Sequence, residues 1–66
     1  MYYNSFNFDT QEQVNEFKRL ESKPLSHWPH GAIELAKKES DRIGFCGEVL
    51  MTALRDWIVE NIKEQS

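Results

Sequence analysis

The clearest hydrophobic pattern in this chain lies in its last third. Apolar residues recur there at steps of three and four, at Leu50, Ala53, Leu54, Trp57, Ile58 and Ile62. Because an α-helix has about 3.6 residues per turn, this spacing places all of them along one stripe of a helix. Glu48 adds a negative charge at the positive end of that helix. We therefore expect an amphipathic helix over about residues 47–63.

A narrower stripe earlier in the chain predicts a second helix. Val14, Phe17 and Leu20 recur at three-residue steps. Pro24 disfavours α conformation in the residue before it, so the helix should end ahead of this proline. These limits predict a helix over about residues 10–22.

The start of this helix is marked by two overlapping pairs with capping-box spacing. Asp9 stands three residues before Glu12, and Thr10 stands three residues before Gln13. In either pair the two side chains can satisfy backbone N–H groups that have no partner within the helix. Both pairs therefore predict a helix start here, and the pattern leaves open which of them forms the cap.

The middle of the chain predicts a third helix, over about residues 29–43. Pro29 is tolerated in a first turn, and Gly44 is a natural stop. The residues expected on the buried side are Ala32, Ile33, Leu35, Ala36 and Ile43. Opposite charges four residues apart are expected to pair on the exposed side, Glu34 with Lys38 and Lys37 with Asp41.

Two remaining segments are each compatible with more than one structure. Residues 2–8 place Tyr2, Phe6 and Phe8 on one side of an extended chain. Such a segment is either a short strand that pairs with a second chain or an apolar arm laid on the helices. Residues 23–28 are either a connector or a short edge strand, because two prolines bracket them.

Together these elements predict a mainly α protein of three short helices with a short N-terminal strand or arm, in one domain over residues 1–66. A chain of this size buries only about 60% of the surface that its unfolded form exposes. The C-terminal stripe is also wider than one short neighbour covers, which predicts a homodimer or a complex with a larger protein. The residues expected at that surface are Leu50, Leu54, Trp57, Ile58 and Trp28.

Composition narrows the range of partners. Eight Lys and Arg residues face eleven Asp and Glu residues, for a formal net charge of -3. Nucleic-acid-binding domains usually carry a positive excess, so protein is the favoured partner. The hydrophobic share of 39% is too high for a disordered acidic chain, and we expect the protein to fold.

Cysteine usage and hydropathy bear on the compartment. Cys46 is the only cysteine, so no disulfide can form within the chain, and a reducing cytoplasm is the simpler setting. The first residues lack a basic stretch followed by an apolar run, and nowhere do 18 apolar residues follow one another. We expect a cytoplasmic protein that does not bind membranes.

Metal and thiol chemistry have few candidate residues. His27, His30 and Cys46 are the only soft metal ligands, one short of the four protein ligands of a structural zinc site. Cys46 with a histidine could form a nucleophile and base, but a half-buried cysteine at a helix start is the simpler interpretation. We therefore expect no metal, no cofactor and no enzymatic activity.

Residues 23–62 resemble the ribbon-helix-helix repressors of the Arc type. The matching features are Trp28-Pro29 at the junction into a helix, Gly44 at the end of that helix, and a second amphipathic helix over 50–58. In that family two strands pair across a dimer and enter the DNA major groove.

The resemblance implies which residues would contact DNA. If residues 23–28 form the strand, Lys23, Leu25 and His27, or else Ser26 and Trp28, would point toward the bases. Glu48 departs from the family pattern, because a carboxylate in that first turn opposes a phosphate contact.

The sequence therefore predicts a small non-enzymatic regulatory or interaction protein, of bacterial or phage origin. It would act by covering or scaffolding another protein through its amphipathic C-terminal helix. The alternative is a ribbon-helix-helix transcriptional regulator that binds DNA.

Overall fold

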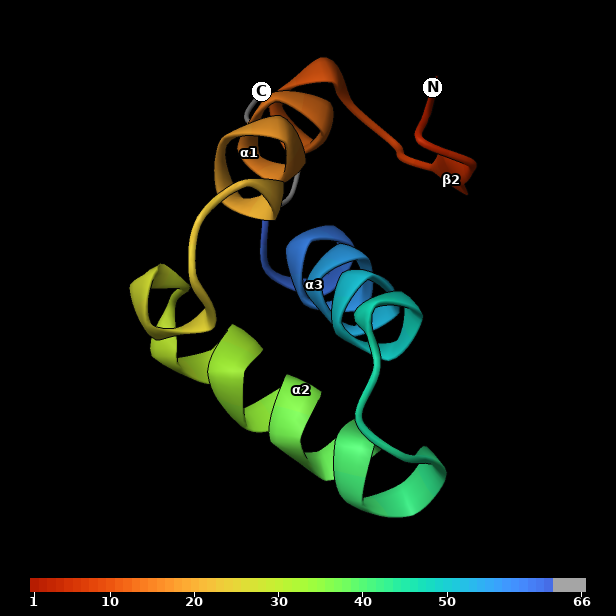
Figure 1. Ribbon diagram of the computed structural model, residues 1–66. Helices are drawn as coiled ribbons and strands as arrows, with labels where there is room; N and C mark the ends of the chain where they lie inside the picture. Colours follow the sequence, from red (N-terminus) through yellow and green to blue (C-terminus); the bar gives the residue numbers. More distant parts are fainter. Residues whose placement is uncertain (63–66) are drawn as a thin grey trace.

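The computed structural model describes residues 1–62 and consists of three helices preceded by a short hairpin (Figure 1). In chain order the elements are β1 (Tyr2–Tyr3), β2 (Phe6–Asn7), α1 (Gln11–Glu21), the 3-10 turn η1 (Leu25–His27), α2 (His30–Ile43) and α3 (Gly47–Asn61). The mainly helical fold and its three helices are confirmed, each within two residues of the expected limits. The expected end of the last helix at residue 63 lies outside the described residues.

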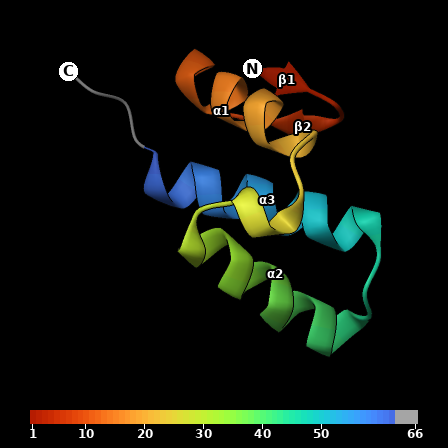
Figure 2. The same cartoon turned by 60° about the vertical axis from the view of Figure 1, so that its left-hand side comes forward.

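The central position of α3 explains its wide apolar stripe. Figures 1 and 2 show α3 between α2 on one side and α1 with the hairpin on the other. The core between them is formed by Phe8, Val14, Phe17, Leu20, Trp28, Ala32, Ala36, Ala53, Leu54 and Ile58. A helix with neighbours on two sides buries apolar residues around more of its circumference than a helix packed on one. Much of the surface expected to need a partner is thus covered within the chain.

The cap of α1 uses the second of the two possible pairs. The hydroxyl of Thr10 accepts a hydrogen bond from the backbone N–H of Gln13, and the side chain of Gln13 accepts one from the backbone of Thr10. Gln13 Oε1 also accepts a bond of 2.7 Å from the backbone N–H of Asp9. Gln13, and not Glu12, is therefore the residue that closes the capping box.

The end of α2 follows the sequence prediction in one respect and departs from it in another. Gly44 forms the C-cap at φ 122°, a conformation that residues with a Cβ rarely adopt. Ile43 was expected on the buried side of α2, and this was wrong because its side chain is 60% exposed. It is the last residue of the helix, where the chain turns away toward α3.

The charge pairs on α2 also differ from those expected. Glu34 lies 3.5 Å from His30, and Glu39 lies 2.8 Å from Arg42. Neither Glu34 with Lys38 nor Lys37 with Asp41 forms an ion pair within residues 1–62. The charges of Lys37 and Asp41 are therefore not matched to each other on the helix.

The N-terminal segment is a two-stranded antiparallel hairpin, with β1 paired to β2 of the same chain. Its turn residues Asn4 and Ser5 have positive φ angles of 53° and 72°, as expected for a two-residue hairpin turn. The turn brings Tyr3 opposite Phe6, and both pack on the core, while Tyr2 is 79% exposed. The expectation that Tyr2 and Phe6 share a face was wrong, because the turn interrupts the alternation along a single strand.

The hairpin is fastened to two helices. Tyr3 donates a hydrogen bond from its hydroxyl to the Glu21 carboxylate of α1. Arg55 of α3 donates from Nε and Nη2 to the carbonyl oxygen of Asn7, at 3.2 and 3.1 Å. The rings of Tyr3, Phe6 and Phe8 surround the ring of Phe17, with centroids 5.9, 5.6 and 5.3 Å away. The aromatic segment is therefore part of the fold.

Candidate functional site

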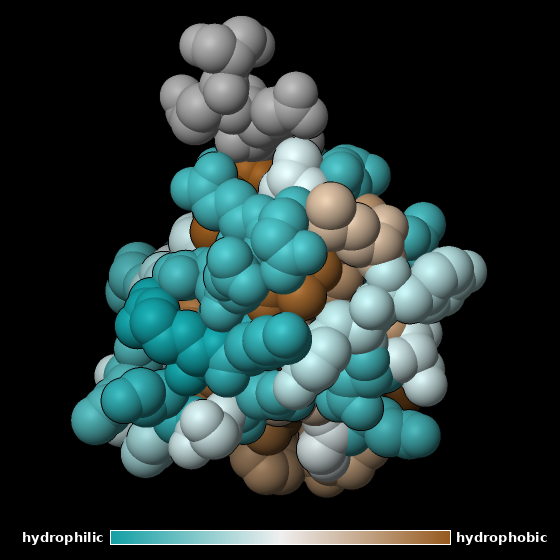
Figure 3. Space-filling view, turned by 90° about the horizontal axis from the view of Figure 1, so that it is seen from above, coloured by the Kyte–Doolittle hydropathy of each residue, from teal (hydrophilic) through white to brown (hydrophobic). Residues whose placement is uncertain are grey.

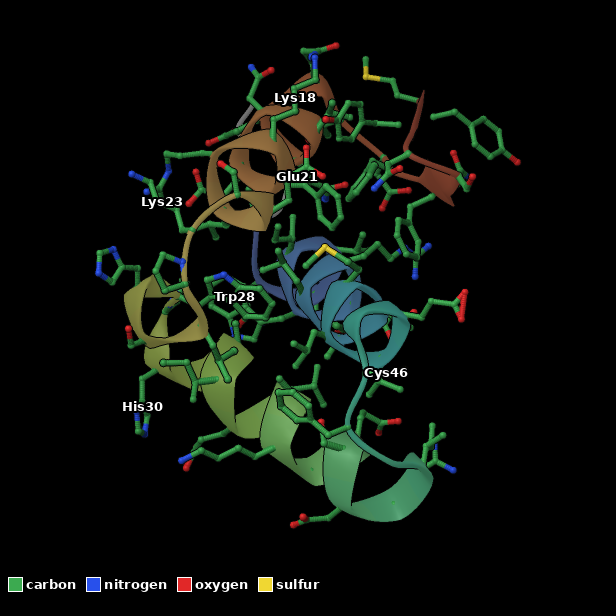
Figure 4. All side chains as sticks on the ribbon, viewed as in Figure 1. Lys18, Glu21, Lys23, Trp28, His30 and Cys46 are labelled. Carbon is green, nitrogen blue, oxygen red and sulfur yellow. The ribbon has the colours of Figure 1, made fainter. Side chains whose placement is uncertain are left out.

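The residues expected to bind a partner lie mostly inside the chain. Leu54 and Ile58 of α3 are fully buried, and Trp28 is 5% exposed. The indole of Trp28 points between the helices and donates a 3.0 Å hydrogen bond to the carbonyl oxygen of Leu20 (Figure 4). These three residues were expected at a partner surface, but a partner can reach none of them while the fold stays closed. Only Leu50 and Trp57 of the expected set are half-buried.

Trp57 is occupied by a contact between helices. A Cβ added at Gly31 would stand 2.5 Å from Trp57 Nε1, so the indole lies directly on the backbone of α2. Glycine permits this close approach because it has no side chain. Trp57 is therefore a contact between α2 and α3 that is only partly open to a partner.

The segment expected to read DNA in the alternative function is not a strand. Residues 25–27 form the 3-10 turn η1, and its hydrogen bonds run from His27 N to Pro24 O and from Trp28 N to Leu25 O. Lys23 and His27 are exposed, whereas Leu25 is half-buried. The described chain thus lacks the extended segment that the ribbon-helix-helix resemblance implies.

His30 and Cys46, two of the three candidate metal ligands, lie apart. Figure 4 shows His30 at the start of α2 and Cys46 at the start of α3, on opposite sides of the molecule. Residues 1–62 contain no group of three or more His, Cys, Asp or Glu side chains able to hold a metal ion. Cys46 is exposed, so the expectation of a half-buried cysteine was wrong.

Large apolar side chains are exposed at two places in the described chain. One is the start of the hairpin, where Met1 is 56% and Tyr2 79% exposed. The other is the connection between α2 and α3, where Ile43 is 60% and Phe45 72% exposed. The face over α1, seen from above in Figure 3, is mainly hydrophilic with small apolar patches.

Apolar residues are exposed or half-buried around the connection between α2 and α3, and we call this set the apolar corner. It comprises Ile43 and Phe45 together with the half-buried Val49 and Leu50 of α3. Phe45 and Leu50 line one hollow, and Ile43 and Val49 line another of about 120 Å³. The helical patterns of the sequence stop at Gly44 and assign no role to Phe45. The sequence does contain a sign of this surface. Loops are usually polar, and here two large apolar residues, Ile43 and Phe45, flank Gly44.

A hollow of about 210 Å³ lies beside Phe45, and we call it the corner hollow. Its lining residues are Leu25, Ala36, Lys37, Ser40, Asp41, Phe45 and Leu50. Lys37 and Asp41 contribute one charge of each sign, and both side chains are exposed. The hydroxyl oxygen of Ser40 is buried and makes no hydrogen bond within residues 1–62. The hollow therefore combines apolar walls with two oppositely charged rim residues.

A wider depression of about 590 Å³ lies between the hairpin turn and the start of α3. Its lining residues are Asn4, Ser5, Phe6, Gly47, Glu48, Met51 and Thr52. Glu48 is the single carboxylate in this set, with no histidine, cysteine or lysine beside it.

The lining of the corner hollow carries one charge of each sign, from Lys37 and Asp41. The smaller hollow beside Ile43 is lined by two acidic residues, Glu39 and Glu48. The whole chain has a formal charge of -3. The corner hollow is therefore a place without net charge on an acidic protein.

Comparisons of this chain with protein-family models, with curated proteins and with solved structures found no match. No helix within residues 1–62 has the length and apolar character needed to cross a bilayer.

Proposed function

We propose that this chain is a small non-enzymatic interaction protein that binds another protein through the apolar corner. The observation that carries the proposal is the exposed Phe45, which lines a hollow with apolar walls, together with the exposed Ile43 two residues earlier in the chain. Binding a partner would remove these side chains from water, at about 25 cal/mol for each Å² of apolar surface buried. Exposed aromatic residues next to a pocket are frequent anchors of protein interfaces.

The proposed mechanism is occlusion or scaffolding. The protein would cover an apolar surface on its partner, and no bond would be made or broken. The proposal moves the binding surface from the middle of α3 to its first turn and the loop before it, because Leu54 and Ile58 are buried. A regulatory role would follow if the covered surface is a functional one.

Cys46 allows a direct test, because it is exposed, stands beside Phe45 and is the only cysteine in the chain. A benzophenone maleimide attached to Cys46 is irradiated in extract from the native host, and covalent adducts are identified by mass spectrometry. We expect defined protein adducts. The control carries the same label at Asn15→Cys in a Cys46→Ser background, since Asn15 is exposed on α1.

A matched pair of variants shows whether the corner itself is needed. In the Cys46-labelled protein, Phe45→Ser should abolish the adducts, while Tyr2→Ser, which removes an equally exposed aromatic ring from the hairpin, should leave them unchanged. Identical adducts from the labels at positions 46 and 15, or adducts that survive Phe45→Ser, would refute the proposal.

DNA binding stays the alternative prediction, and it has its own measurement. Affinity for duplex DNA at two salt concentrations would support it if binding is present and falls steeply with salt. The alternative fails if no binding occurs at about 50 mM salt.

A further inference from the structure

We propose that the corner hollow receives Phe45 from a second copy of this chain, so that two copies form a symmetric dimer. The inference rests on the proposed function, because it names the occupant of the same apolar corner. It differs from the dimer expected from the sequence, which used the middle of α3, now buried.

The first argument is shape. Phe45 is 72% exposed, and it also forms one wall of the hollow of about 210 Å³. A protruding ring and an adjacent hollow on one surface are what a two-fold interface requires, because each copy must offer both halves of the contact. When two copies meet about an axis near Phe45, each ring can enter the hollow of the other copy. The walls that it would contact include Leu25, Ala36 and Leu50.

The second argument is charge. Lys37 and Asp41 both line the hollow, and they form no ion pair with each other or with another side chain within residues 1–62. A two-fold axis that passes between these two residues would place Lys37 of one copy opposite Asp41 of the other, and the reverse contact would form at the same time. The lining of the hollow carries no net charge, so it adds no like-charge repulsion between two negatively charged copies.

The size of the surface sets the expected affinity. A contact built on Phe45, Ile43 and a few neighbours is smaller than the interfaces of about 1,200–2,000 Å² that hold stable complexes. We therefore expect a weak, reversible dimer with a dissociation constant between about 10 µM and 1 mM.

The first measurement is sedimentation of the purified full chain as a function of concentration. We expect the mean mass to rise from 7.8 kDa toward twice that value over the range given above. Phe45→Ala should weaken dimerisation by about tenfold or more, as loss of an interface anchor does. Tyr2→Ala is the matched control and should leave the dissociation constant unchanged. Circular dichroism of both variants establishes that they are folded.

The second measurement exchanges charges and does not depend on Phe45. Lys37→Glu alone and Asp41→Lys alone should each weaken self-association, because each places like charges in contact across the axis. An equimolar mixture of the two variants should restore it, since both contacts in the mixed dimer again join opposite charges. Lys23→Glu makes the same change in net charge as Lys37→Glu at an exposed position that does not line the hollow, and it should have a much smaller effect.

Several results would overturn this inference. They are a monomer at every concentration, a dimer indifferent to Phe45→Ala, and a charge-swapped mixture that associates no better than its separate components. If the chain is monomeric but Phe45-dependent adducts to a foreign protein form in extract, the second copy is excluded as the occupant and the proposed function stands. If neither self-association nor adducts depend on Phe45, both proposals fail.

Discussion

Gln13 links the start of α1 to the residue that follows α3. It is 1% exposed, and its Oε1 closes the cap of α1, while its Nε2 donates a 2.6 Å hydrogen bond to the carbonyl oxygen of Ile62. A buried amide can serve both ends because it carries an acceptor and a donor. Neither capping-box spacing nor hydrophobic periodicity indicates the contact with Ile62, which lies 49 residues away.

Replacing Gln13 by Glu tests this double role. The carboxylate keeps the acceptor but loses the donor, so it faces the Ile62 carbonyl oxygen without a proton. We expect a loss of about 1–3 kcal/mol in unfolding free energy at neutral pH. The loss should shrink as the pH falls, because a protonated Glu regains a donor. Gln11→Glu, at an exposed position of the same helix, is the control for urea denaturation.

Tyr3 links the hairpin to α1 and should titrate abnormally. The hydrogen bond to the Glu21 carboxylate, more than burial or charge repulsion, raises the pKa of Tyr3 above its ordinary value of 10.0. A raised pKa means that the contact stabilises the fold below pH 10 and is lost as the pH rises through the raised value. Lys18 Nζ lies 5.0 Å from the centre of the Tyr3 ring.

The titration can be followed by ultraviolet absorbance in a Tyr2→Phe background, where Tyr3 is the only tyrosine. Glu21→Gln should move the pKa of Tyr3 back toward its ordinary value, because a neutral amide accepts a weaker hydrogen bond from the Tyr3 hydroxyl than a carboxylate does. Glu12→Gln, at an exposed position at the other end of α1, should not. Equal titration curves for Glu21→Gln and its parent would contradict the contact.

At the scale of elements, the crossing of α2 and α3 depends on small residues. Gly31 lies under the Trp57 indole, and Ala32, Ala36 and Ala53 are fully buried. Short side chains allow two helices to approach closely.

Gly31→Ala should therefore destabilise the protein. The new methyl group would collide with a rigid indole, and overpacking of this kind costs about 1–3 kcal/mol, more than the gain in helix propensity. Gly47→Ala is the matched control, because a Cβ there meets nothing within 4 Å. The double variant Gly31→Ala with Trp57→Leu should lose less than the sum of its parts, as measured by thermal denaturation. Additive losses would argue against the contact.

At the scale of the whole molecule, one core serves all the elements. Phe8 after the hairpin, Phe17 of α1, Ala36 of α2 and Leu54 of α3 belong to a single cluster. For a chain of this length the free energy of unfolding is roughly 3–10 kcal/mol. Losing the contacts of one element would therefore remove a large part of the stability of the whole fold. We expect one cooperative transition, with tryptophan fluorescence and far-ultraviolet circular dichroism tracing the same curve.

Leu54→Ala should remove about 2–5 kcal/mol of stability, because Leu54 is fully buried. Lys38→Ala should have little effect, since Lys38 is exposed on α2. Similar denaturation midpoints for the two variants would mean that α3 does not pack as described.

Periodicity and terminal signals in the sequence were enough to place the three helices. Hydrophobic spacing identified the faces of α1 and α3, and Thr10, Pro24 and Gly44 marked limits of the helices that the structure confirms. These signals are local, because a cap or a helical stripe depends on residues within a few turns of one another.

Only the tertiary structure decided which apolar residues remain accessible. The stripe around Leu54 was expected to need a partner, yet α3 lies between two layers of its own chain and buries it. Ile43 and Phe45, at a turn that periodicity does not describe, are exposed instead. The reason is physical: a pattern states which face of a helix is apolar, but the covering of that face depends on contacts between residues far apart in the chain.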